Sequence, residues 1–142
     1  MVSIDDLKIG TVVDILDPYS TPPKRKYSII IAVAEDKFYI GTVYINTEIN
    51  VLTINSPELV SLQHEICQVK YAFLQHDSFV DCSDMKPRLQ SELLRQLSDG
   101  GRIVGRIAKD DIVAINTLVR SSDTIMPYYK KLCNLREYVS PA

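Results

Sequence analysis

A polar cluster lies near the middle of the chain, at the entry to a short apolar segment. Residues 74–83 contain one of the two histidines, two aspartates, two serines and a cysteine. Polar groups that enter a folded core are unfavourable unless they are paired, so such a cluster forms either a structural network or a site. His76, Asp77 and Ser78 are the candidate catalytic residues of this cluster.

His76 is the residue best suited to proton transfer. The imidazole of a histidine ordinarily has a pKa near ~6.5, so it can accept and donate a proton near neutral pH. Asp77 or Asp81 could orient the ring, but Asp77 would point away from His76 in a regular strand, and only a turn would let the two cooperate. The alternative is that His76 and Asp77 shape a turn through hydrogen bonds to the backbone.

A basic segment, Lys24-Arg25-Lys26, closes a loop that contains three prolines. Two adjacent prolines stiffen this loop, so a bound phosphate would cost it less conformational entropy. Short runs of charge also occur in solvated loops that bind nothing. Lys24, Arg25 and Lys26 are therefore candidate phosphate-binding residues, with a solvated loop as the alternative.

The composition is typical of one soluble globular domain covering residues 1–142. Hydrophobic residues make up 46% and charged residues 24%, and the net charge is −2. This charge argues against a protein that grips nucleic acid with its whole surface, but it permits a local basic patch.

Three cysteines and two histidines show no spacing typical of a metal site. Cys67, Cys82 and Cys133 form no CxxC pair, and no second pair supports His64 and Cys67. We therefore expect neither a metal nor another cofactor.

The start of the chain lacks the pattern of a signal peptide, and the longest apolar run, 29–34, is too short to span a membrane. These features predict a cytoplasmic protein with reduced thiols.

The elements that must position the candidate residues follow from hydrophobic periodicity. We expect strands at 11–16, 27–33, 38–45, 67–71, 79–82 and 102–107, and helices at 57–66, from 84 to 99, from 110 to 120 and after 127. Sequential strands joined by short turns favour antiparallel pairing. The prediction is an α+β fold, a small antiparallel barrel or curled sheet with inserted and C-terminal helices.

This order of elements is similar to that of the PemK/MazF family of toxins from toxin–antitoxin modules. The similarity lies in Lys24-Arg25-Lys26 before an aliphatic strand, in residues 78–83, and in Gly105-Arg106-Ile107 before a helix. It implies an SH3-like β-barrel, a homodimer, a cognate antitoxin protein, and an endoribonuclease that cleaves single-stranded RNA without a metal.

Metal-free cleavage through the 2′-hydroxyl requires a base, an acid for the leaving oxygen, and a cation for the developing charge. Under this hypothesis His76 serves as acid and base, Asp77 and Ser78 support it, and Lys24 and Arg25 hold phosphate. Tyrosines beside the basic segment could stack on bases.

Two other functions fit the same sequence. The first is a non-catalytic interaction module that binds a protein partner with the same barrel, favoured by the near-neutral charge. Phe73-Leu74-Gln75 also stands where the family has an arginine followed by an acid, so no catalytic arginine is carried over. The second is a structural subunit of a larger assembly, with contacts through 89–97 and Tyr128-Tyr129.

Overall fold

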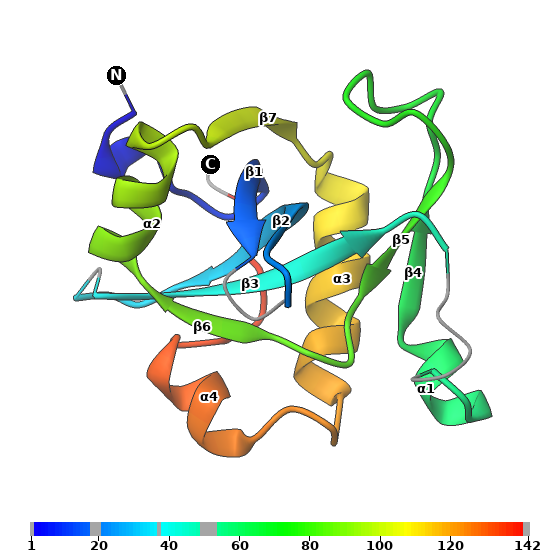
Figure 1. The fold of residues 1–142 in the computed structure, drawn as a ribbon. Coiled ribbons are helices and arrows are strands. Elements are labelled where there is room, and N and C mark those ends of the chain that lie inside the picture. Colours follow the sequence, from blue (N-terminus) through cyan, green and yellow to red (C-terminus); the bar gives the residue numbers. More distant parts are fainter. Residues whose placement is uncertain (1, 18–20, 37, 49–53, 141–142) are drawn as a thin grey trace.

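The computed structural model describes the whole chain except residues 1, 18–20, 37, 49–53 and 141–142. These residues form an α+β fold with one mostly antiparallel sheet and four α-helices (Figure 1). The strands are β1 (Thr11–Asp17), β2 (Lys24–Val33), β3 (Tyr39–Asn46), β4 (Gln63–Ile66), β5 (Ser78–Asp81), β6 (Lys86–Leu89) and β7 (Arg102–Arg106). The helices are η1 (Ile4–Asp6, a 3-10 turn), α1 (Pro57–Ser61), α2 (Gln90–Ser98), α3 (Lys109–Ser121) and α4 (Pro127–Leu132).

The sheet follows the path β4-β5-β3-β2-β1-β7, and β6 pairs with the first half of β3. The predicted α+β class is confirmed, as is the β2–β3 hairpin, in which Tyr27 pairs with Ile45 and Val33 with Ile40. Within the described part of the chain no pairing joins β4 to β7, so this sheet is open and a closed barrel is not seen.

The second half of β2, residues 29–33, is apolar on both faces because helices cover both sides of the sheet there. One core joins β-strand residues such as Ile29 and Val43 to Ile115 of α3. The other joins Ile30 and its neighbours to Leu93 of α2. In Figure 1, α2 and α3 lie apart, with β1 and β2 between them.

Two predicted elements between β3 and β5 are wrong. The helix begins as expected, with Ser56 Oγ accepting from the backbone N–H of Leu59, but it ends at Ser61. Ile66, which would continue its apolar spacing, lies in β4 instead and pairs with Ser78. Cross-strand pairing outweighs a short helical period here. The strand predicted at 67–71 is a pair of turns, and Val69 is 98% exposed.

The predicted start of the second helix is also wrong. Residues 86–89 form β6, and the helix begins only at Gln90. Pro87 lies opposite Gly41 on this outer strand, a position that tolerates the missing N–H. The basic segment likewise belongs to β2 rather than to the loop before it, since Lys24 pairs with Asp17 and Lys26 with Ile15.

Among the described residues, no helix combines the length and apolar character required to cross a membrane.

Candidate functional site

The three basic residues occupy the first positions of β2, where successive side chains point to opposite faces of the sheet. Arg25 lies on the face of Asp14, with its Nε 3.3 Å from Asp14 Oδ1. Lys26 lies on the other face, with its Nζ 4.5 Å from the centre of the Tyr44 ring. Lys24 is exposed. Strand geometry thus separates charges that are adjacent in the sequence.

A hollow of ≈ 380 Å³ opens where β2 begins and β3 ends, and we call it the His76 hollow. Its lining comes from β2, from the end of β3 and from the connection between β4 and β5: Arg25, Lys26, Tyr27, Ile45, Asn46, Thr47, Phe73, Leu74, Gln75, His76 and Ser78. Among the residues that the structure describes, this lining includes an imidazole and two cationic residues but no carboxylate. The fold therefore brings His76 and Arg25, which are far apart in the sequence, to one hollow.

The three predicted catalytic residues have different environments. His76 and Asp77 are exposed, whereas Ser78 is only 2% exposed. Asp77 Oδ1 accepts a hydrogen bond of 2.8 Å from the backbone N–H of Gln68, and Ser78 Oγ donates one of 2.9 Å to the carbonyl oxygen of His76. Among the described residues, the His76 ring makes no hydrogen bond or ion pair. Asp77 and Ser78 thus shape the turn, and the imidazole faces solvent.

Arg25 is held in the hollow by a carboxylate that sequence reasoning did not single out. The Asp14 side chain, only 9% exposed, lies between Arg25 and Arg102, whose Nε is 3.3 Å from Asp14 Oδ2. Arg25 Nη2 also donates to the carbonyl oxygens of Asp14 and Gly100, at 3.2 and 3.0 Å. Two guanidinium groups against one carboxylate leave this position positively charged. Only the pairing of β1 with both β2 and β7 brings the three together.

Aromatic rings form part of the same wall. The rings of Tyr27 and Phe73 meet edge to face with centroids 5.7 Å apart, and the centroid of the Tyr71 ring lies 5.6 Å from that of Phe73. Gly105 makes room for this arrangement, because a Cβ there would lie 2.8 Å from Phe73 Cδ1. Such rings can stack on unpaired bases.

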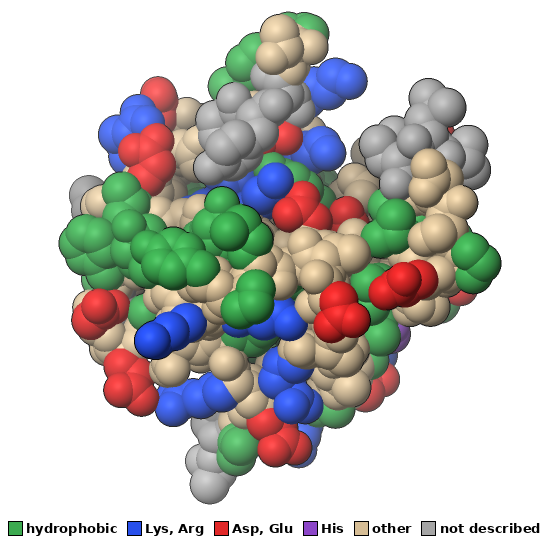
Figure 2. All heavy atoms as spheres, turned by 90° about the horizontal axis from the view of Figure 1, so that it is seen from below, with side chains coloured by type: hydrophobic (Ala, Val, Ile, Leu, Met, Phe, Trp, Pro, Cys, Tyr) green, Lys and Arg blue, Asp and Glu red, His purple; other side chains and the backbone are tan. Residues whose placement is uncertain are grey.

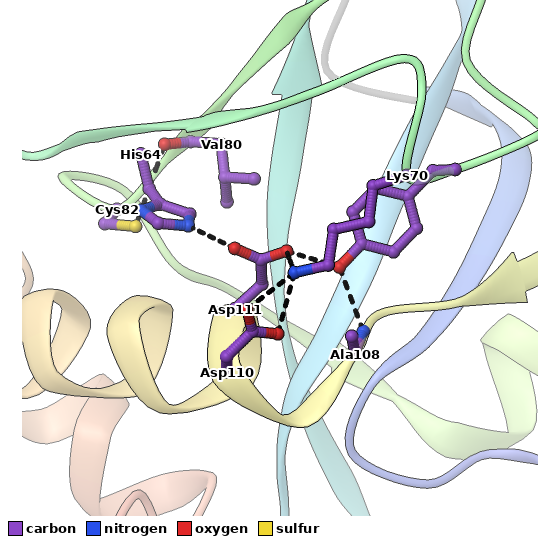
Figure 3. A network of polar contacts seen from close by, with 8 residues as sticks. His64, Lys70, Val80, Cys82, Ala108, Asp110 and Asp111 are labelled. Atoms are coloured by element: carbon purple, nitrogen blue, oxygen red, sulfur yellow. Dashed lines mark hydrogen bonds and ion pairs between the residues drawn. The ribbon is translucent and has the colours of Figure 1, made fainter.

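The start of α3 carries a polar network centred on Asp111 (Figure 3). Asp111 Oδ1 lies 2.8 Å from His64 Nε2, and Asp111 Oδ2 accepts from Lys70 Nζ at 3.0 Å and from the Tyr71 hydroxyl. Lys70 also donates to Asp110, and the Tyr71 oxygen accepts from the backbone N–H of Ala108. We call this the Asp111 network.

The Asp111 network ties the β4–β5 connection to the first turn of α3. Because Lys70 and Tyr71 precede Phe73 and His76 in that connection, the network supports one wall of the His76 hollow. His64, the other histidine, has a side chain that is 22% exposed and bound to Asp111. Among the described residues, no side-chain polar atom of this network is buried without a partner, so we interpret it as structural support.

A second hollow, of ≈ 570 Å³, is the acidic counterpart of the first. Its lining includes four acids and two lysines, namely Asp17, Glu48, Asp81, Asp84, Lys26 and Lys86. Below it the buried Tyr44 hydroxyl donates to Asp17 Oδ1 at 2.8 Å and accepts from Arg88 at 3.2 Å. Burial and the bond to Asp17 raise the pKa of Tyr44 well above its usual range. With more acids than lysines in its lining, the second hollow is less favourable for phosphate binding than the His76 hollow.

Asp81 belongs to this second hollow and does not orient His76. Its Oδ1 accepts from Gln63 Nε2 at 2.8 Å and from the backbone N–H of Ser83 at 3.1 Å.

The neighbouring Cys82 is buried, and burial raises the pKa of its thiol to about 12. Cys133 is also buried, Cys67 is exposed, and none of the three cysteines forms a disulfide. In the described ranges no group of three or more His, Cys, Asp or Glu residues could hold a metal ion.

Compared with protein-family models and with curated proteins, the chain matches none. The similarity to PemK/MazF toxins therefore rests on the residues quoted for it and stays a prediction.

Proposed function

We propose that this chain is an endoribonuclease that cleaves single-stranded RNA without a metal, with its site in the His76 hollow. One observation carries the proposal. An exposed imidazole and a guanidinium fixed by a buried carboxylate line the same carboxylate-free hollow. A base for the 2′-hydroxyl and a cation for the phosphate are the two groups that this chemistry most needs.

In the proposed reaction His76 takes the proton of the ribose 2′-hydroxyl. The 2′-oxygen then attacks the adjacent phosphorus, and the bond from phosphorus to the 5′-oxygen breaks. Arg25 meets the negative charge on the non-bridging oxygens, since its guanidinium is already oriented by Asp14. The 5′-oxygen takes a proton from water, and the hydroxide left behind takes the proton held by His76, which restores the base. The products are a 2′,3′-cyclic phosphate and a 5′-hydroxyl.

The preference for single strands is proposed from the walls of the hollow. Phe73 and Tyr27 can stack on a base only where it is unpaired. The net charge of the chain is −2, so the positive charge that lines the His76 hollow is a local feature. Lys26 also lines the hollow, but its ammonium lies over Tyr44, so Arg25 and His76 are the groups assigned to the phosphate.

The wider PemK/MazF-like hypothesis belongs to the same proposal. It comprises an SH3-like barrel, a cytoplasmic homodimer and a cognate antitoxin protein. Exposed apolar side chains support a protein partner, and Figure 2 shows one such group gathered on a single face. Phe38, Met126 and Tyr128 are each more than half exposed, at 57%, 54% and 63%. A native mass measurement would show whether the chain pairs with itself.

The test is incubation of the purified protein with labelled single-stranded RNA in EDTA, beside His76→Ala. The chain offers a matched control in its other histidine, so His64→Asn is assayed in parallel with thermal unfolding of each variant. We expect cleavage by the parent and by folded His64→Asn, and a loss of 10²- to 10⁴-fold in rate for His76→Ala. Absence of cleavage by the parent, or equal cleavage by His76→Ala, would contradict the proposal.

The second candidate function is the non-catalytic interaction module. The observation that favours it is the role of Asp77 and Ser78, which are bound to backbone groups and leave His76 without an orienting carboxylate. Binding of RNA or a protein partner without any cleavage in the same assay would select this function.

A further inference from the structure

The strongest unexplained feature near the site is the second arginine on Asp14. One guanidinium is sufficient to neutralise a carboxylate, yet Asp14 has two, from strands on either side of β1. Bringing like charges together is unfavourable unless something negative offsets them. The Arg102 side chain is nevertheless 66% exposed, so its guanidinium is open to a ligand from solvent.

The two arginines use their donors differently. Arg25 binds Asp14 and Gly100 through Nε and Nη2 and faces the His76 hollow. Arg102 uses only its Nε, which donates to Asp14. Among the described residues its two terminal nitrogens have no hydrogen-bond partner. The Asp14 carboxylate thus orients Arg102. The outer edge of the Arg102 guanidinium, the part that binds phosphate in a bidentate manner, stays available.

Neighbouring arginines do not offer the same edge. Arg106, at the other end of β7, donates through both terminal nitrogens, to Thr11 Oγ1 and to the carbonyl oxygen of Ile9, each at 3.0 Å. Arg95 on α2 is paired with Glu92. Arg102 is therefore the residue beside Arg25 that can extend the cationic surface away from the hollow.

We infer that Arg102 binds a second phosphate of the RNA, adjacent in the chain to the phosphate that Arg25 binds in the His76 hollow. The ligand class is a single-stranded oligonucleotide with at least two phosphates. This inference rests on the proposed function and adds the path of the RNA across the protein surface, which runs from the His76 hollow over Asp14 towards β7. Asp14 is then a positioning residue for both phosphate contacts.

The test uses uncleavable 2′-O-methyl oligouridylates with a fluorescent label, one carrying a single phosphate and one carrying three. Their binding to the parent, Arg102→Gln and Arg102→Lys is measured by anisotropy at several salt concentrations. Arg136→Gln is the matched control, because Arg136 is 69% exposed and is paired only with Glu35 among the described residues. Thermal unfolding of each variant checks the fold.

We expect Arg102→Gln to weaken binding of the longer probe several-fold and to reduce the slope of log K against log salt by about 0.7, the value of one single-strand phosphate contact. Arg102→Lys should keep most of the slope, and the short probe should bind equally to all variants. Equal slopes for Arg102→Gln and Arg136→Gln, with the parent still binding and cleaving RNA, would overturn this inference alone. A parent that binds neither probe would overturn the proposed function as well.

Discussion

At the scale of single residues, neighbours in the sequence have different roles. His76 faces the hollow, while Asp77 binds the backbone N–H of Gln68 across the turn and Ser78 binds the carbonyl oxygen of His76. Arg25 and Lys26 are likewise separated by the alternation of β2. Each residue must therefore be tested by itself.

Asp77→Ala should lower stability with little loss of the proposed cleavage. The substitution removes the acceptor of the Gln68 N–H, and a hydrogen bond to a charged group contributes about 1.5–3 kcal/mol, less at an exposed position such as this. Denaturant unfolding and cleavage rates of the folded variant would be compared with those of His76→Ala. A loss of rate as large as that of His76→Ala would show that Asp77 acts in the chemistry.

Gly105→Ala should weaken RNA binding through Phe73. A Cβ at this position would lie 2.8 Å from the Phe73 ring, so the ring must move away from its place beside Tyr27. Base stacking contributes about 1–3 kcal/mol per base, so a loss of affinity of about tenfold is expected. Phe73→Leu is the comparison, and unchanged affinity in both variants would remove Phe73 from the binding surface.

At the scale of elements, the connection between β4 and β5 places His76. This segment projects beside the sheet (Figure 1) and is fastened by the Asp111 network to the start of α3 (Figure 3). Burial tends to raise the pKa of Asp111, but hydrogen bonds from Tyr71, His64 and Lys70 outweigh it and hold that pKa below its usual value. The charged carboxylate is therefore the form that stabilises the fold.

Asp111→Asn should destabilise the protein by about 2 kcal/mol near neutral pH, the scale of hydrogen bonds to a charged group. Because the pKa of Asp111 is lowered in the folded state, its contribution is present above the unfolded value near ~3.9 and is lost as the pH falls through the folded value. The difference in unfolding free energy between parent and variant should thus shrink below about pH 4. Urea unfolding from pH 7 down to pH 3 measures it.

Asp110→Asn is the matched control for this prediction. Its carboxylate binds Lys70 but is 72% exposed, so solvent screens the pair and its loss should change stability much less than Asp111→Asn does. If the two variants have equal effects at pH 7, the Asp111 network does not fasten the connection in the way described.

At the scale of the whole molecule, the central strands belong to two cores at once. Ile29 faces the core under α3 and Ile30 the core under α2, and both are fully buried. The shared strands couple the two cores, so a substitution that disrupts one core should also destabilise the other. Charged side chains of both signs are interspersed over the face seen in Figure 2, which leaves the positive charge of the site a local feature.

Leu93→Ala and Ile115→Ala should each lower the free energy of unfolding by about 2–5 kcal/mol, although they lie in different cores. Each variant should still unfold in a single transition, because both cores share β1, β2 and β3. Far-UV and near-UV circular dichroism, the latter reporting the tyrosines, would be followed together in denaturant. Two separate transitions would show that the cores unfold independently.

The sequence by itself determined the elements whose signals are local. Alternation and β-branched residues marked β1, β2 and β3, a serine and a proline marked the start of α1, and spacing of leucines marked α2. It also singled out His76 and Arg25 as residues with suitable chemistry. These features depend on neighbours within a few positions in the chain, so the local sequence is sufficient to predict them.

Only the tertiary structure decided what these residues face. The assignment of 63–66 to a strand depends on β5, and the support of Arg25 depends on Asp14 of β1 and on the carbonyl oxygen of Gly100, just before β7. The Asp111 network joins residues about 40 positions apart, so no local pattern predicts it. Long-range pairing, register and burial select among local preferences that are nearly equal in energy, and for that reason they appear only in the folded chain.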